Sequence, residues 1–134
     1  MDILIWQETY NVGIEKFDKQ HKQLVSYINI LYNVINSNEK QKVVGELIAK
    51  LIEYSETHFL DEEDLLKKIE YPEYSDHKIV HKKFIKTVKD FQDRFVKGDS
   101  FVSKDLLYFL QRWLIKHILE EDKKYSGYFL NKKL

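Results

Sequence analysis

Residues 75–98 read SDHKIVHKKFIKTVKDFQDRFVKG and indicate an α-helix more clearly than any other stretch of the chain. One set of side chains recurs at alternating intervals of four and three residues: His77, His81, Phe84, Val88, Phe91 and Phe95. That spacing puts them on one face of a helix with about 3.6 residues per turn. Ser75 can cap the first turn, and Gly98 can end the last one. The sequence therefore predicts a helix over about 75–97 whose inner face carries two histidines.

Three other segments show the same period, and residues that end helices separate them. Moving outward, we expect helices over about 40–69, 103–125 and 15–36, with Ser103 as a candidate N-cap. Their inward positions are Leu47, Leu51, Tyr54, His58, Leu65 and Ile69, then Leu106, Leu110, Trp113 and His117, and finally Phe17, His21, Leu24, Ile28, Leu31 and Ile35. Short connections force neighbouring helices to run antiparallel. The expected fold class is all-α, an antiparallel up-down-up-down four-helix bundle.

The beginning of the chain differs from the rest. Residues 1–14 show no helical period and include Gly13, so we expect an extended N-terminal arm that packs Ile5 and Trp6 on the bundle. A chain of 134 residues is long enough to build one hydrophobic core. Residues 1–134 are therefore predicted to form a single domain.

The composition excludes several classes of protein. Lys and Arg number 22 and Asp and Glu number 22, so no net charge favours nucleic acid or an anionic membrane as a partner. The chain has no cysteine, which excludes disulfides, iron–sulfur clusters and thiolate metal sites. No signal peptide can be recognised, and no stretch reaches the roughly 20 apolar residues that span a bilayer. We expect a cytoplasmic protein whose metal ligands would be nitrogen and oxygen.

All five histidines fall on the inward positions of the four predicted helices: His21, His58, His77, His81 and His117. Each lies near the start or the end of its helix, and in an antiparallel bundle these places meet at one end. A lone histidine on an apolar face is ordinarily a core residue. Five histidines at one end of the bundle instead favour a metal site.

Two carboxylates lie at ligand spacing from these histidines. Glu62 follows His58 by four residues, one turn further along the same face. Asp122 follows His117 by five residues, which on an ideal helix is about 140° around the axis. Either the fourth helix is locally widened there, or the Asp122 side chain reaches back into the site. Other acidic residues surround both carboxylates, so an alternative reading makes them ordinary surface charges.

A buried polar cluster without a metal is the alternative to a metal site. It would place five imidazoles and two carboxylates inside the bundle. Such burial costs free energy unless every polar group has a partner. We therefore favour metal ligation over a metal-free cluster.

The number of candidate ligands favours two metal ions. Imidazole and carboxylate without thiolate suit iron, but also zinc, copper and manganese. Seven side chains exceed the roughly six positions of one octahedral ion. If both carboxylates and one oxide or hydroxide bridge two ions, about eleven of about twelve positions are filled and one stays open. Two Fe(II) ions could each give one electron to oxygen at the open position, and the bridging hydroxide could give its proton, so that a terminal hydroperoxide and an oxo bridge form with no outside electron or proton.

Reversible oxygen binding would also require a pocket that excludes water and offers no further acid. Apolar residues next to the predicted ligands are candidates for lining such a pocket: Leu24, Phe59, Trp113, Leu114 and Ile118. The alternative reading is that they are ordinary core residues.

The pattern of histidines and carboxylates resembles the full ligand pattern of the hemerythrin family. The resemblance rests on HKQL at 21–24, HFLDE at 58–62, HKIVH at 77–81 and WLIKHILEED at 113–122. The opening from Trp6 to Gly13, with DKQH at 18–21, resembles the bacterial branch of that family, the bacteriohemerythrins. The match covers nearly the whole chain.

This resemblance implies a non-haem di-iron centre that binds oxygen reversibly. The implied ligands are His77, His81 and His117 on a six-coordinate iron, His21 and His58 on a five-coordinate iron that binds oxygen, and Glu62 and Asp122 as bridges. Tyr125 matches a tyrosine that is usual in the family, and we expect it to lie just outside the ligands.

Two other functions stay open: a di-iron enzyme that handles oxygen, peroxide or nitric oxide, and an oxygen or iron sensor. Ferritin-like di-iron enzymes draw on Glu-x-x-His motifs, and none occurs in this chain. A histidine-rich site also donates less negative charge to high-valent iron. We therefore expect an oxygen carrier and not an enzyme, acting as a free-standing monomer, with an oxygen-consuming enzyme as a candidate partner.

Overall fold

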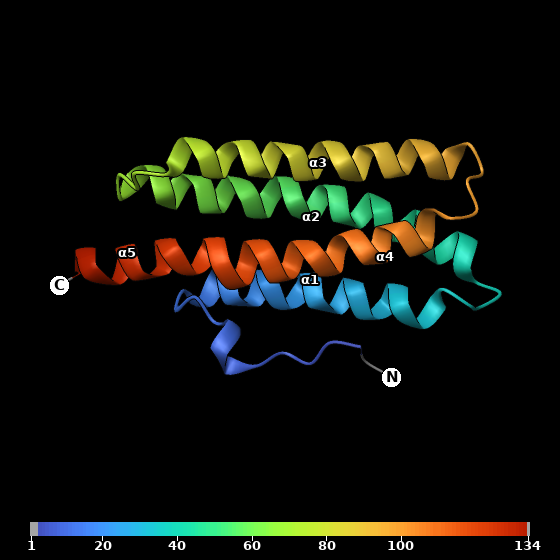
Figure 1. Ribbon diagram of the computed structural model, residues 1–134, viewed down its shortest axis with the longest axis horizontal. Helices are drawn as coiled ribbons and strands as arrows, with labels where there is room; N and C mark the ends of the chain where they lie inside the picture. The colour runs from blue at the N-terminus through green and yellow to red at the C-terminus, as the bar shows by residue number, and fades with distance from the viewer. Residues whose placement is uncertain (1–2, 134) are drawn as a thin grey trace.

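The computed structural model describes residues 3–133, so the first two residues of the predicted arm and Leu134 lie outside the described range. The first three long helices are α1 (Glu15–Val34), α2 (Lys40–Lys68) and α3 (Tyr74–Val96). The fourth is continuous but has three parts, α4 (Val102–Trp113), the π-helical segment η2 (Leu114–Asp122) and α5 (Lys123–Lys133). Successive helices run antiparallel (Figure 1), and residues 3–133 contain no strand. The predicted all-α up-down-up-down bundle is confirmed.

Each long helix packs against two others. The contacts join α1 to α2, α2 to α3, α3 to α4 and α4 back to α1, so the four helices enclose one common interior. The turn from α2 to α3 and the C-terminal end of α5 lie at the same end of the bundle as the start of α1 (Figure 1). Within residues 3–133, no helix combines the length and apolar character needed to cross a membrane.

The interior contains two apolar clusters, separated along the bundle axis. On α1, Leu24 belongs to the larger cluster and Phe17 to the smaller one, and His21 lies one turn from each. On α2, Phe59 and Leu66 occupy the same two clusters. The helical period therefore leaves a layer of polar side chains between two apolar layers.

Two helices begin one residue before their predicted N-cap residues. α3 begins at Tyr74 and α4 at Val102, so Ser75 and Ser103 lie inside the first turn. An N-cap side chain must come from the residue just before the helix, because only there can it reach the N–H groups of the first turn. Both N-cap predictions are wrong, and Ser103 is buried instead.

The fourth helix does not end near Tyr125, as predicted, but continues to Lys133. Tyr125 and Ser126 are buried, and the Ser126 hydroxyl donates a hydrogen bond to the carbonyl oxygen of Val12 in the arm. Gly127 is less favourable in a helix than alanine by about 1 kcal/mol, but it does not end one. Contact with the N-terminal arm thus favours further helix where the sequence pattern fades.

The N-terminal arm is extended up to a short 3₁₀ turn, η1 (Glu8–Tyr10). The Asn29 amide of α1 holds it, accepting a hydrogen bond from the Leu4 N–H and donating one to the Leu4 carbonyl, both 2.9 Å. Leu4 and Trp6 pack on the core, whereas Ile5 is 73% exposed. Side chains alternate in an extended chain, so Ile5 points outward when both neighbours point inward. The packing prediction is therefore confirmed for Trp6 and wrong for Ile5.

Candidate metal centre

The polar layer between the two clusters contains all seven side chains predicted as metal ligands. They come from every long helix: His21 from α1, His58 and Glu62 from α2, His77 and His81 from α3, and His117 and Asp122 from η2. Each is buried, with no more than 5% of its surface exposed. The antiparallel order of the helices is what brings these side chains to one level.

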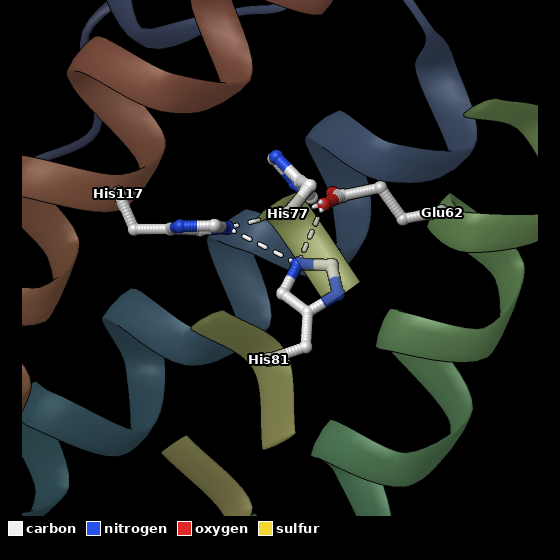
Figure 2. A group of neighbouring side chains, drawn as sticks. All are labelled: Glu62, His77, His81 and His117. Atoms are coloured by element: carbon white, nitrogen blue, oxygen red, sulfur yellow. Dashed lines mark hydrogen bonds and ion pairs between the residues drawn. The ribbon is translucent and has the colours of Figure 1, made fainter. Parts of the chain in front are cut away.

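One group of ligand atoms comes from Glu62, His77, His81 and His117, and all of them lie within 4.8 Å of one another. Glu62 Oε1 is 2.7 Å from His77 Nε2 and 3.0 Å from His81 Nε2. His81 Nε2 is 3.2 Å from His117 Nε2. Figure 2 shows the ring nitrogens and the carboxylate turned toward one another. A single ion between them could contact all four side chains.

A second group consists of His21, His58 and the other oxygen of Glu62. Glu62 Oε2 is 3.2 Å from His58 Nε2 and 3.7 Å from His21 Nε2. The two oxygens of this one carboxylate therefore face different histidine groups.

Asp122 divides its oxygens in the same way. Asp122 Oδ1 is 3.2 Å from His77 Nε2 and 3.1 Å from His117 Nε2, both in the first group. Asp122 Oδ2 is 3.2 Å from His21 Nε2, in the second group. Two carboxylates thus span one group of three histidines and one group of two.

The π-helical segment η2 explains how Asp122 reaches this position. His117 and Asp122 both lie within η2, where backbone hydrogen bonds join residues five apart instead of four. An interval of five residues in a π-helix returns to nearly the same face. Of the two alternatives left open by the sequence, local widening of the fourth helix is the one that occurs.

In the metal-free protein, the carboxylates hold protons on several imidazoles. Burial lowers the pKa of His21, but the nearby negative charges of Asp122 and Glu62 outweigh burial and raise the pKa to about 9. The same balance raises the pKa of His77 to about 10. Burial dominates at His58, whose pKa is lowered.

The two carboxyl groups stay ionised despite their burial. Burial and the charge of Glu62 raise the pKa of Asp122, but the nearby imidazoles outweigh them and hold it well below its usual range. The pKa of Glu62 is also held well below its usual value, because the same imidazoles outweigh the effect of burial. Metal ligands must be deprotonated, and both carboxyl groups already are.

Several buried polar atoms of this layer have no hydrogen-bond partner. In the described part of the chain, His21 Nδ1 and Nε2, His117 Nδ1 and both oxygens of Asp122 have no hydrogen-bond partner. The short approaches of Asp122 to imidazole nitrogens are therefore contacts without hydrogen-bond alignment. A buried polar network without a metal would pair its members. These unpaired atoms argue against the metal-free alternative, and the imidazole and carboxylate donors suit a metal such as iron.

Two further residues hold the candidate ligands from outside. The Tyr125 hydroxyl donates a hydrogen bond to Glu62 Oε2, at 3.1 Å. Glu63 Oε2 lies 2.9 Å from His81 Nδ1. The sequence indicated contact for Tyr125, but not for Glu63, because an acidic residue in a run of acidic residues looks like a surface charge.

A small cavity of about 10 Å³ lies beside the ligands His21, His58 and His117. Its other walls are Leu24, Tyr54, Phe59, Phe84, Trp113 and Ile118. Four of the five residues predicted to line an oxygen pocket are therefore at this cavity.

Leu114, the fifth of those residues, is not among the lining residues. Leu114 is buried in the larger apolar cluster. The preceding residue, Trp113, lies one turn before His117, and the two rings stack with their centroids 4.2 Å apart. Tyr54 and Phe84 do line the cavity and were missed, although both occupy inward positions of the predicted helices. Their periodicity was a usable signal, but it does not distinguish a cavity wall from the rest of the core.

Known proteins resemble this chain over most of its length. A family model described as the hemerythrin HHE cation-binding domain matches residues 12–129. A bacteriohemerythrin of Stenotrophomonas maltophilia is 36% identical over 126 residues, which are 94% of this chain and 81% of that protein. A myohemerythrin of Theromyzon tessulatum is 34% identical over 122 residues, 91% of this chain and 90% of that one.

A solved structure agrees as well. A crystal structure of a wild-type hemerythrin superposes with a TM-score of 0.84 at 28% identity, over 93% of this chain and 96% of that chain. Because the family model, the similar sequences and the fold all agree, the chain belongs to the hemerythrin family.

Proposed function

We propose that this protein binds molecular oxygen reversibly at a di-iron centre and so carries or stores oxygen. The observation that supports the proposal is the division of two buried carboxylates between a group of three histidines and a group of two. In the proposed assignment, His77, His81 and His117 hold one iron, His21 and His58 hold the other, and Glu62 and Asp122 bridge them. The family match and the relatives named as bacteriohemerythrin and myohemerythrin support iron and oxygen.

The unequal histidine groups favour one open position. With both carboxylates and an oxide or hydroxide as bridges, three histidines fill the roughly six positions of one iron, and two histidines leave about one position free on the other. When bound, two Fe(II) ions would supply the two electrons that bring oxygen to the peroxide level. The hydroperoxide expected from the sequence belongs to this proposal and stays a prediction.

The small cavity supports this assignment. Its wall includes both proposed ligands of the less crowded iron, His21 and His58, together with His117 of the other group. Most of its other walls are apolar, so they would exclude water from the bound ligand. Oxygen is small and uncharged and can enter an apolar site that disfavours ions.

Tyr54 lines the cavity and carries a hydroxyl group that could donate a proton to bound oxygen, but this hydroxyl already donates a hydrogen bond to another group. Its hydroxyl donates a hydrogen bond to the carbonyl oxygen of Gln20 at 2.5 Å. Burial raises the pKa of Tyr54 well above its usual value. The phenol therefore keeps its proton and does not offer it to a ligand in the cavity. Without an added proton, release of oxygen is favoured over its further reduction, which supports a carrier over an enzyme.

The expectations of a monomer, of a cytoplasmic location and of an oxygen-consuming partner enzyme belong to the same proposal. The equal numbers of basic and acidic residues disfavour nucleic acid and membranes as partners. Oxygen itself is the ligand that we propose.

An anaerobic-to-aerobic optical titration of the Fe(II) protein would test the proposal. We expect about two irons per chain, new absorption from charge transfer between peroxide and Fe(III) when oxygen is added, and loss of that absorption when oxygen is removed. Irreversible oxidation with release of hydrogen peroxide would favour an enzyme or a sensor. Fewer than two irons per chain would contradict the centre itself.

A matched pair of variants distinguishes loss of a metal ligand from mere loss of a negative charge in η2. Asp122→Asn removes a proposed bridge and should lose at least one iron together with the oxygen-dependent absorption. Glu120→Gln makes the same chemical change two residues away, at an exposed position of η2, and should leave both unchanged. Equal behaviour of the two variants would count against the bridging role.

A further inference from the structure

One ligand histidine is held through a chain of side chains that reaches the surface between α1 and α2. Gln20 Oε1 lies 2.5 Å from His58 Nδ1. The Gln20 amide nitrogen donates a hydrogen bond to Asp61 Oδ2 at 3.0 Å. Lys16 Nζ lies 3.2 Å from the same Asp61 oxygen. Neither Gln20 nor Asp61 has a place in the ligand set.

The chemistry of Asp61 decides which way the Gln20 amide points. An ionised carboxylate only accepts hydrogen bonds, so the NH₂ group of Gln20 must face Asp61. The amide oxygen of Gln20 must then face His58. That oxygen can only accept, so His58 Nδ1 has to be the donor.

Lys16 supports this orientation, because its ammonium group lies 3.2 Å from the Asp61 oxygen that accepts the hydrogen bond from Gln20. An ammonium group can only donate, so this Asp61 oxygen faces donors on both sides. The Asp61 side chain is 24% exposed and that of Lys16 is 64% exposed, so the chain of contacts ends in solvent.

The backbone of Gln20 is fixed as well as its side chain. Its carbonyl oxygen accepts the hydrogen bond from Tyr54, whose ring stacks on His58 with an interplanar angle of 9°. Gln20 and Tyr54 therefore hold the imidazole of His58 at its edge and at its face. The remaining nitrogen, Nε2, is turned toward Glu62 at 3.2 Å.

We infer that Gln20, oriented by Asp61 and Lys16, is a positioning residue that keeps the proton of His58 on Nδ1 and leaves Nε2 free to bind metal. This inference rests on the proposed function, because it needs His58 as a ligand. A partner on the second ring nitrogen commonly fixes both the tautomer and the orientation of a metal-bound histidine.

The two halves of the centre differ in the charge of that partner. His81, in the group of three histidines, has the Glu63 carboxylate at 2.9 Å from its Nδ1. His58, in the group of two, has the neutral amide of Gln20 at the same ring position. A carboxylate makes its histidine a stronger donor than an amide does. If iron is bound, the outer contacts would therefore favour Fe(III) more strongly in the group of three.

Substitution of Gln20 in the anaerobic Fe(II) protein tests this role. Gln20→Met keeps a similar volume but removes the acceptor, and the double variant Gln20→Glu with Asp61→Asn restores an acceptor without placing two carboxylates side by side. Gln41→Met makes the first change at an exposed residue of α2, away from the site. The readouts are Fe(II) affinity by competition with a chelator, and solvent exchange of the ligand N–H protons, whose NMR signals high-spin Fe(II) shifts far downfield.

In Gln20→Met we expect one ligand N–H signal to exchange at least about tenfold faster, as loss of one hydrogen bond implies. Affinity for one of the two irons should fall roughly 10- to 100-fold. The double variant Gln20→Glu with Asp61→Asn should restore the slow exchange, and Gln41→Met should match the original protein. The thermal midpoint of each metal-free variant shows whether a loss is merely structural, because instability alone would not select one N–H signal.

The outcomes separate this inference from the proposed function. If the original protein binds two irons and Gln20→Met leaves N–H exchange and affinity unchanged, the role of Gln20 is wrong and the centre stands. If the original protein binds fewer than two irons, the proposed centre fails, and the role of Gln20 fails with it.

Discussion

Single acidic residues in this chain differ sharply in their surroundings. Glu62 and Asp122 have no exposed surface, whereas their neighbours Asp64 and Glu120 are exposed. A buried carboxylate without a partner would be protonated or would destabilise the fold. Both stay ionised because imidazoles surround them, and the same charges hold protons on those imidazoles. The metal-free site therefore stores protons that a metal must displace.

Proton release on metal binding follows from these pKa values. At pH 7, a pKa of about 9 at His21 and about 10 at His77 means that both are protonated in the metal-free protein. A ligating imidazole must be neutral, so loading iron at pH 7 should release at least two protons per chain, with further protons from any water that becomes the bridging hydroxide. Because the protons compete with the metal, apparent affinity should rise with pH up to about 9 to 10.

Calorimetry of anaerobic Fe(II) binding in buffers of different ionisation enthalpy would measure this release. The dependence of the observed heat on the buffer gives the number of protons directly. Binding heats that are the same in all buffers at pH 7 would contradict the raised pKa values.

At the scale of secondary structure, η2 is the element on which the site depends most. Its π-helical hydrogen bonds accommodate one residue more than an α-helix would, and π-helical turns of this kind often mark functional sites. This extra residue lets an interval of five aim His117 and Asp122 at the same place.

Deletion of Glu120 would test that reading of η2. The deletion should convert the segment to regular α-helix and leave His117 and Asp122 four residues apart, still on one face. We therefore expect two irons per chain to be retained, as measured by metal analysis.

Deletion of the exposed Leu60, between His58 and Glu62, is the matched control. α2 is regular there, so the loss of one residue turns half of the helix by about 100° and removes it from its place in the core. That variant should lose iron and fold poorly. Loss of iron in both deletions would mean that the π-helical geometry itself is needed.

The ends of α2 and α3 use the same backbone motif with different residues. At the end of α2, Glu70 has φ 58°, and the following N–H bonds to the Leu66 carbonyl at 2.9 Å. At the end of α3, Gly98 has φ 81°, and the following N–H bonds to the Arg94 carbonyl at 3.0 Å. Only glycine adopts such φ values without steric cost.

Exchange of these residues should therefore have opposite effects on stability. Glu70→Gly removes the left-handed strain and should raise the free energy of unfolding by about 1 kcal/mol. Gly98→Ala introduces the strain and should lower it by about 1 kcal/mol. Denaturation by urea measures both, and a destabilised Glu70→Gly variant would show that another contact of Glu70 outweighs its backbone strain.

For the whole molecule, the polar layer lies inside the protein's own core. His21 stands between Phe17 and Leu24, and Glu62 stands between Phe59 and Leu66, so the layer cannot hydrate without opening both apolar clusters. A metal that binds only the folded state stabilises it by about 4 kcal/mol at a thousand times its dissociation constant. Folding and metal binding are therefore coupled.

Removal of the metal should lower the melting temperature by roughly 10–20 °C for a chain of this size. Thermal unfolding followed by circular dichroism, with and without a chelator, would measure the shift. In Asp122→Asn, the chelator should have much less effect. An unchanged melting temperature after complete metal removal from the original protein would contradict the coupling.

The sequence by itself determined the four helices and the candidate ligands, because both depend on local periodicity. The positions of His77, His81 and Phe84 follow from the helical repeat, and the antiparallel order follows from short connections. Only the tertiary structure decided the finer geometry. It decided that η2 is π-helical, that Leu4 of the arm packs on the core, and that Gln20 contacts His58, a residue 38 positions away. Such features depend on which distant residues compete for the same space and the same protons, and no local pattern records that.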